Sequence, residues 1–107
     1  IMPPNDKLVC LQAIHWSHGS FGYFPTYSLG SMLSAQLFAT FETEHGDAAP
    51  SIRAGDHRAL RTWLHAKIHR HGKRYMTGDL VQHATGKALG SSDFIAYATR
   101  KYADVWA

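Results

Sequence analysis

Apolar residues recur every three or four positions in four separate runs of this sequence, and this spacing limits what the chain can fold into. An amphipathic helix repeats its apolar face at that interval, whereas a half-buried strand alternates apolar and polar residues. The sequence contains no convincing alternating run. The pattern predicts an all-α fold, a small helical domain of about four helices with an aromatic Gly/Pro loop near the N-terminus.

The first two predicted helices are separated by a short break. The first is expected over about residues 27–45 and is ended by Gly46, because glycine commonly closes helices. Residues 46–50 form the break, and the second helix stops at Gly72. The apolar positions that support these helices are Leu29, Met32, Leu33, Leu37, Phe41, Leu60, Trp63, Leu64 and Ile68.

The third and fourth predicted helices are marked by their ends. Thr77 is expected to cap the N-terminus of the third, and Gly86 is expected at its C-terminal end. Ser92 and Asp93 open the fourth. The apolar positions of these two helices are Leu80, Val81, Ala84, Phe94, Ile95, Ala98, Tyr102 and Val105.

The N-terminal quarter of the chain follows no helical period. Residues 7–16 are a short apolar stretch that fits either a helix end or a strand. Residues 17–27 combine glycine and proline with several aromatic residues, which predicts a structured loop that packs or lines a pocket. Residues 1–6 are expected to be disordered or foreign to the natural chain, and residues 1–107 are treated as one domain.

Composition favours a single soluble globular unit. The chain has 107 residues, of which 45% are hydrophobic and 18% charged, with a net charge of only +3. This balance is weak evidence for nucleic acid binding. A single Cys10 excludes an internal disulfide and is expected to be a buried thiol in a reducing compartment. No apolar run is long enough to span a bilayer, so a cytoplasmic protein without membrane contact is expected.

Two of the eight histidines, His65 and His69, are four residues apart in the second predicted helix. Zinc enzymes use this spacing on one helical face, with a glutamate directly after the first histidine as general base. Ala66 occupies that position, and the sequence holds no H-E-x-x-H. We interpret the pair as a half-exposed basic helix end and assign no metal ligand in this chain.

Residues 69–74 are basic and allow two interpretations. Clustered lysine and arginine can bind phosphate or RNA. The same residues coincide with the C-terminus of the second predicted helix, where cations are favoured by the helix dipole. We prefer the second interpretation, and a helical protein that binds RNA or buffers metal is the weakest of our hypotheses.

Residues 12–27 carry the strongest chemical signal. They combine an imidazole, two phenols, an indole and a carboxamide with glycines that permit close backbone approach. Phenol and imidazole donors aimed at one point can stabilise the oxyanion that forms in peptide hydrolysis. Composition alone makes this interpretation about as probable as a simple aromatic core cluster.

A resemblance decides between these alternatives. Residues 15–30 read H-W-S-H-G-S-F-G-Y-F-P-T-Y-S-L-G and closely resemble the signature of the thermostable (Taq-type) carboxypeptidase family, H-W-S-x-G-x-F-G-Y-F-P-T-Y-x-L-G. Residues 35–38, 63–72 and 79–102 resemble later segments of that family. The similarity covers nearly the whole chain and corresponds to the C-terminal portion of a longer, mostly helical peptidase.

The resemblance implies a homodimeric zinc metallocarboxypeptidase that removes residues from peptide C-termini. The zinc would belong to the full-length family enzyme, and none is expected in this chain. The family's G-x-x-Q-D-x-H-W motif is only partly matched, because Val9 replaces the glycine and Ala13 the aspartate. The resemblance thus indicates part of a hydrolase and leaves open whether this chain is itself an enzyme.

The resemblance also assigns roles to residues of the aromatic segment. Tyr27 would be the oxyanion donor, assisted by Tyr23 and His15. Gln12 and Trp16 would contact the substrate. His18 stands where the family usually has a small residue and is given no role.

Our first hypothesis is therefore the substrate-cleft half of a metallocarboxypeptidase, inactive alone because the H-E-x-x-H motif is absent. Its partners would be peptide C-termini and either a second copy of the chain or the missing N-terminal portion. The alternative is a standalone helical interaction or regulatory module that has kept the fold and lost catalysis. The substitutions at Val9 and Ala13 favour this alternative.

Overall fold

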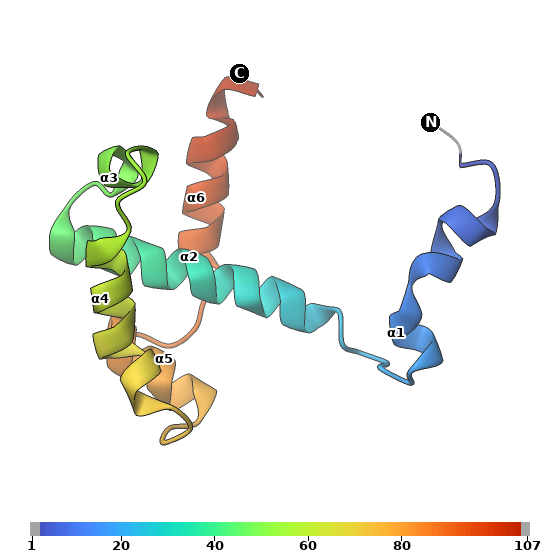
Figure 1. Cartoon of the computed structure of the whole chain (residues 1–107), viewed down its shortest axis with the longest axis horizontal. Helices are drawn as coiled ribbons and strands as arrows, with labels where there is room; N and C mark the ends of the chain where they lie inside the picture. Colours follow the sequence, from blue (N-terminus) through green and yellow to red (C-terminus); the bar gives the residue numbers. More distant parts are fainter. Residues whose placement is uncertain (1–2, 106–107) are drawn as a thin grey trace.

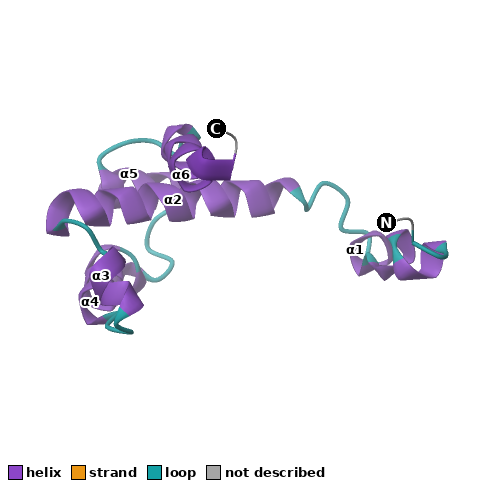
Figure 2. Cartoon of the chain, turned by 90° about the horizontal axis from the view of Figure 1, so that it is seen from above, coloured by secondary structure: helices purple, strands orange, loops and turns teal. Residues whose placement is uncertain are grey.

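A computed structural model describes residues 3–105, and every regular element in that range is helical (Figures 1 and 2). The all-α prediction is confirmed. The α-helices are α1 (Ile14–Ser17), α2 (Pro25–His45), α3 (Ala49–Arg53), α4 (Arg58–Lys67), α5 (Thr77–Thr85) and α6 (Ser92–Tyr102). Short 3-10 turns lie at η1 (Asp6–Leu8), η2 (Cys10–Gln12), η3 (His69–His71) and η4 (Ala103–Val105).

The four predicted helices correspond to α2, α4, α5 and α6, with corrected ends. α2 starts at Pro25, two residues earlier than expected, because proline is well suited to the first position of a helix. α4 ends at Lys67 instead of continuing to Gly72, since the backbone at Ile68 leaves helical geometry. Thr77 is the first helical residue of α5 rather than its N-cap. Gly86 closes α5 in the left-handed conformation, as predicted.

The expected break over residues 46–50 contains the start of a helix that the sequence did not reveal. α3 begins at Ala49, whose backbone N–H donates to the Asp47 carboxylate at 2.9 Å. The predicted break contains Asp47 and Pro50, and both residue types also favour the first turn of a helix. The open stretch 7–16 is made of one-turn helices, and no strand occurs among the described residues.

A small apolar core joins α2 to α4. Phe41, Ala48 and Trp63 are buried, and their neighbours Leu37, Phe38, Ile52, Leu60 and Leu64 pack against them. The indole N–H of Trp63 donates to Glu44 at 2.7 Å, and the Lys67 ammonium donates to the other Glu44 oxygen at 3.0 Å. These two hydrogen bonds hold the pKa of Glu44 below its ordinary value.

A buried glutamine joins α2 to the segment between α5 and α6. Gln36 is completely buried, and its amide donates to the Thr85 hydroxyl at 2.8 Å and to the carbonyls of Lys87 and Ala88 at 3.2 Å. Its side-chain oxygen accepts from the Gly90 backbone N–H at 3.1 Å. One side chain on α2 therefore holds the α5–α6 connection, because the buried amide of Gln36 needs partners and finds all of them in that segment.

Many large apolar side chains outside this core are exposed to solvent. Ile95, Tyr102 and Val105 were expected in the packed face of the last helix, but they are 58%, 50% and 71% exposed. The radius of gyration is 17.8 Å, whereas a compact domain of this length has about 13 Å. The N-terminal segment with α1 projects beyond the start of α2 and away from the other helices (Figures 1 and 2).

Some expectations fall partly outside the described residues. Residues 1 and 2 belong to the stretch that was expected to be disordered, and they are not among the described residues. The side chain of Cys10, expected to be buried, is likewise not described. Within residues 3–105, no helix has the length and hydrophobicity to cross a membrane.

We predict that Gln36→Leu destabilises the chain by about 1–3 kcal/mol in chemical denaturation, because it leaves the Gly90 N–H and the Ala88 carbonyl without the partner that Gln36 provides. Gln82→Leu is the matched control. Gln82 is exposed and makes one hydrogen bond, to the Gly86 carbonyl at 2.8 Å. Equal losses for the two variants would contradict the structural role given to Gln36.

Candidate functional site

His15 lies at the centre of a cluster of rings that we call the aromatic cluster. Its members are His15, Trp16, Phe21, Tyr23, Phe24 and Tyr27. The imidazole stacks on Tyr23 with ring centroids 5.4 Å apart, and Phe24 lies against it at 4.8 Å. The edge of Tyr27 faces it at 6.3 Å. Rings on three sides hold the imidazole plane in place.

A hydrogen bond joins His15 to the residue expected to be the oxyanion donor. The Tyr27 hydroxyl lies 3.4 Å from His15 Nε2, and either atom can be the donor, depending on the imidazole tautomer. The other ring nitrogen, Nδ1, is buried and has no hydrogen-bond partner among the described residues. Tyr27 therefore fixes the position of Nε2. Nδ1 has no donor or acceptor beside it that would set the tautomer of the imidazole.

The two phenols affect each other. Tyr23 and Tyr27 are packed edge to face with ring centroids 5.3 Å apart. Desolvation raises the pKa of Tyr27 above its ordinary value, and the nearby Tyr23 phenol raises it further. A phenol with the ordinary pKa of 10.0 is already protonated at neutral pH, so Tyr27 can donate a hydrogen bond there with or without this shift.

The local sequence explains how the chain brings these rings together. Gly19 and Gly22 have φ angles of 72° and 75°, a conformation that side chains with a Cβ rarely adopt. They reverse the chain after α1, and the Ser20 backbone N–H donates to the His15 carbonyl at 2.9 Å. Thr26 then donates its hydroxyl to the Tyr23 carbonyl at 2.6 Å at the start of α2. The two phenols are thereby returned to the imidazole.

The other two predicted site residues lie at the edge of this arrangement. Trp16 packs against Phe21 and Phe24 and is 51% exposed. The Gln12 amide donates to the Lys7 carbonyl at 2.7 Å, which directs it along the N-terminal segment. The cluster as a whole is exposed, so the aromatic segment packs mainly on itself and does not reach the core.

Ala13 stands at the N-cap position of α1, where no side chain bonds to the helix N-terminus. The family motif noted above has aspartate at this position. Aspartate is a strong N-cap residue, because its carboxylate accepts from the free backbone N–H groups of the first turn. The position therefore suits a cap of the helix that carries His15, and alanine leaves it uncapped.

The described residues do not fit a zinc site. No group of three His, Cys, Asp or Glu side chains that could hold a metal ion occurs in the described part of the chain. His65 and His69 do not share one continuous helix, since α4 ends at Lys67. His71 and His83 pack edge to face with ring centroids 5.3 Å apart, and no third ligand completes that pair.

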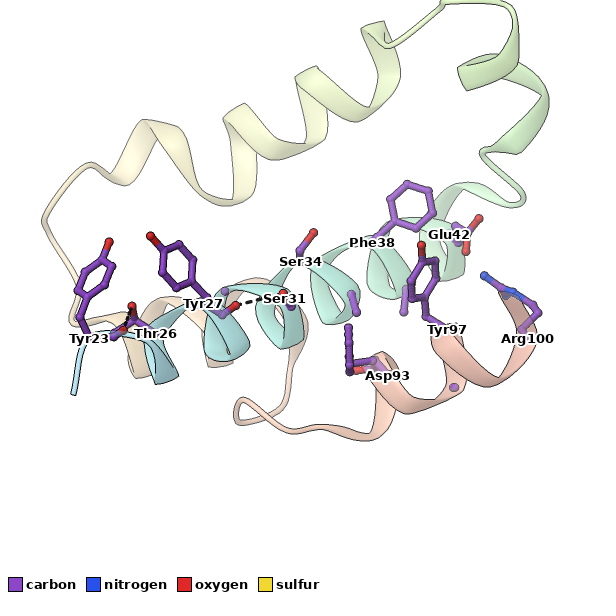
Figure 3. A pocket seen from close by; sticks show the side chains of 15 residues that line it. Tyr23, Thr26, Tyr27, Ser31, Ser34, Phe38, Glu42, Asp93, Tyr97 and Arg100 are labelled. Carbon is purple, nitrogen blue, oxygen red and sulfur yellow. Dashed lines mark hydrogen bonds between the residues drawn. The ribbon is translucent and has the colours of Figure 1, made fainter. Parts of the chain in front are cut away.

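A groove of about 830 Å³ runs from the aromatic cluster along α2 and α6. Figure 3 shows Tyr23 and Tyr27 at one end, with their hydroxyls pointing to the same side, and Glu42 and Arg100 at the other. Small residues of α2 line it, namely Gly30, Ser31, Ser34, Ala35 and Ala39. The amino-acid sequence did not predict this groove. The only signal was that Asp93, Tyr97 and Arg100 recur at helical spacing.

The helical fold of the described residues and the paired phenol and imidazole agree with the resemblance to a helical metallopeptidase, and comparison with known families establishes the class. The family described as "Carboxypeptidase Taq (M32) metallopeptidase" matches residues 1–102. The chain belongs to this family, as the resemblance of residues 15–30 indicated.

Curated relatives agree with this assignment and show how much of the fold the chain contains. It is 38% identical to thermostable carboxypeptidase 1 of Thermus thermophilus over 106 residues, which is 99% of this chain and 21% of the relative. It is 36% identical to carboxypeptidase 1 of Bacillus subtilis, with the same coverage. The chain therefore spans about a fifth of the length of the curated relatives it matches.

Solved structures give the same result. Metallocarboxypeptidase 1 of Trypanosoma cruzi superimposes with a TM-score of 0.83 at 42% identity, covering 92% of this chain and 21% of that structure. The crystal structure of BsuCP superimposes with a TM-score of 0.86 at 36% identity, covering 97% and 21%. The helices described here are thus one part of a larger helical fold.

We predict that Tyr23→Phe lowers the pKa of Tyr27 toward its ordinary value of 10.0, because the second phenol is removed. Desolvation by the ring is kept, so the pKa stays above that value. Titration of tyrosine-labelled protein by NMR measures this change. Tyr102→Phe, outside the aromatic cluster, is the control, and an unchanged Tyr27 pKa in Tyr23→Phe would contradict the coupling.

Proposed function

We propose that this chain is the substrate-cleft part of a zinc-dependent metallocarboxypeptidase, which removes single residues from the C-termini of peptides. The observation that carries the proposal is the hydrogen-bonded pair of Tyr27 and His15 beside Tyr23. Membership in a metallopeptidase family and the carboxypeptidase names of its relatives supply the reaction class.

Tyr27 is the proposed oxyanion donor. With the proton of His15 on Nε2, the imidazole donates to the Tyr27 oxygen, and the phenol hydrogen is free to point at a substrate carbonyl. Hydrogen bonds in such a chain strengthen one another. A donor aimed at developing negative charge stabilises the transition state more than the ground state.

The neighbours of this pair are proposed to bind the peptide. Tyr23 presents a second hydroxyl on the same side of α2 as Tyr27, within reach of the same substrate (Figure 3). Trp16 offers an exposed indole face for an apolar side chain. Gln12 would reach the substrate only after leaving the Lys7 carbonyl, to which it is bonded.

The zinc and the general base are proposed to come from the part of the family fold that this chain does not contain. The described residues do not fit a zinc site, so the chain alone is expected to be inactive. When bound in the complete enzyme, zinc would polarise the scissile carbonyl. We further propose that the complete enzyme is cytoplasmic and forms a homodimer, as expected from the resemblance.

The departures from the family motif favour a second candidate function. Val9 and Ala13 replace a glycine and an aspartate of that motif, and Ala13 leaves the helix that carries His15 uncapped. A chain that had lost catalysis would tolerate such changes. It would keep the fold and act as an interaction or regulatory module.

The two functions are separated by activity in a reconstituted enzyme. We predict that the chain, mixed with the part of the T. thermophilus relative that lies outside the match, cleaves a blocked dipeptide when zinc is added. Tyr27→Phe should lower kcat by about 10²–10³-fold, the usual cost of removing an oxyanion donor. Tyr102→Phe should have no effect, because Tyr102 lies outside the aromatic cluster.

Binding without activity in that mixture would favour the regulatory module. Full activity of Tyr27→Phe would reject Tyr27 as the oxyanion donor. Stoichiometric zinc and turnover by the chain alone would reject the conclusion that the metal site lies elsewhere.

A further inference from the structure

Helix α2 differs from the other long helices in having apolar residues on every side. α4 has one apolar face and one polar face, whereas the apolar residues of α2 are spread almost evenly around its axis. Apolar residues on more than one side of a helix need packing partners on more than one side. Here its first two turns are exposed throughout, and Leu29 is 49% exposed.

Gly30 is the second unusual feature of α2. Glycine inside a helix is less stable than alanine, so an interior glycine usually has a packing reason. Gly30 does not need a positive φ, and a Cβ built on it would meet nothing within 4 Å. No described part of this chain therefore requires a glycine at this position. The space beside Gly30 lies in the wall of the groove between α2 and α6.

We propose that this groove is the seat of another part of the family fold, whose backbone lies directly against Gly30. The occupant is the polypeptide that makes up the remaining four fifths of that fold, since the chain covers 21% of the T. thermophilus relative. This inference rests on the proposed function only in identifying the occupant. The contact that it predicts is at Gly30, which has no role in the proposed chemistry.

The lining of the groove fits a close protein contact. Ser34 is one helical turn beyond Gly30, and Ala35 and Ala39 form a second row of small residues that also lines the groove. Phe38 and Tyr97 offer apolar area beyond them. An apolar groove of this kind, left in water, is costly, and a packed segment would remove that cost.

The test uses Gly30→Leu, which should have opposite effects in two settings. In the chain alone it should raise the midpoint of thermal unfolding by about 4 °C, because leucine is the better helix former and a Cβ at this position meets no neighbour. The same substitution should weaken binding to the remainder of the T. thermophilus relative by about ten-fold or more, as measured by calorimetry. The added side chain would overfill the space between Gly30 and the backbone that packs against it.

Thr43→Leu is the matched control. Thr43 is an exposed residue of α2 that does not line the groove, so leucine there should leave affinity unchanged. Tyr27→Phe separates this proposal from the proposed function. The Tyr27→Phe variant should bind the remainder of the relative normally, while the activity of the complex falls. If the natural chain binds tightly but the complex has no activity, the proposed function is rejected and the contact at Gly30 is not.

Several results would overturn the proposal. One is equal affinity of Gly30→Leu and the natural chain, or no binding by the natural chain. Another is a Gly30→Leu variant that binds the remainder normally but whose complex has a raised KM, because the groove would then be a path for substrate. Self-association of the natural chain that Gly30→Leu abolishes would make the occupant a second copy. A lower unfolding midpoint of Gly30→Leu alone would show that the glycine serves this chain's own fold.

Discussion

The arrangement of the helices depends on the buried amide of Gln36. It is the one fully buried polar side chain in the described part of the chain, and it bonds to Thr85, Lys87, Ala88 and Gly90. These bonds hold the segment between α5 and α6 against α2, and the ion pair of Lys87 with Asp93 at 2.8 Å ties that segment to the start of α6. The groove is formed between α2 and α6, so its shape depends on α6 being held in this position.

Helix α2 serves two purposes along its length. Its C-terminal half carries Phe41 and the Glu44 carboxylate that receives Trp63, and these hold α4. Its N-terminal half carries Tyr27 and, through the glycine turn, presents it to His15. The stable half of the helix thus positions the reactive half, which has almost no packing of its own. This division is expected of a segment whose site is completed by other protein.

Sequence periodicity revealed the elements that bury a face. Phe41 and Trp63 repeat at helical spacing with their neighbours, so α2 and α4 were found. The same periodicity placed Ile95 and Val105 in a packed face, but they are exposed, because periodicity cannot show whether the partner of that face is present. α3 was missed because its first turn resembles a loop in composition.

The aromatic cluster was predicted from a long signature, and the structure brings His15, Tyr23 and Tyr27 together. The groove and the Gln36 bonds depend on residues about fifty positions apart, and no local pattern encodes such contacts.

The most direct test of the account is hydrogen exchange of the backbone amides in the first half of α2. Few contacts protect this half in the chain alone, so its amides should exchange as fast as local helix fraying allows. Joining the chain to the remainder of the family fold should slow them to the rate of the amides around Phe41. Equal exchange in the two states would contradict the view that another part of the family fold covers the first half of this helix.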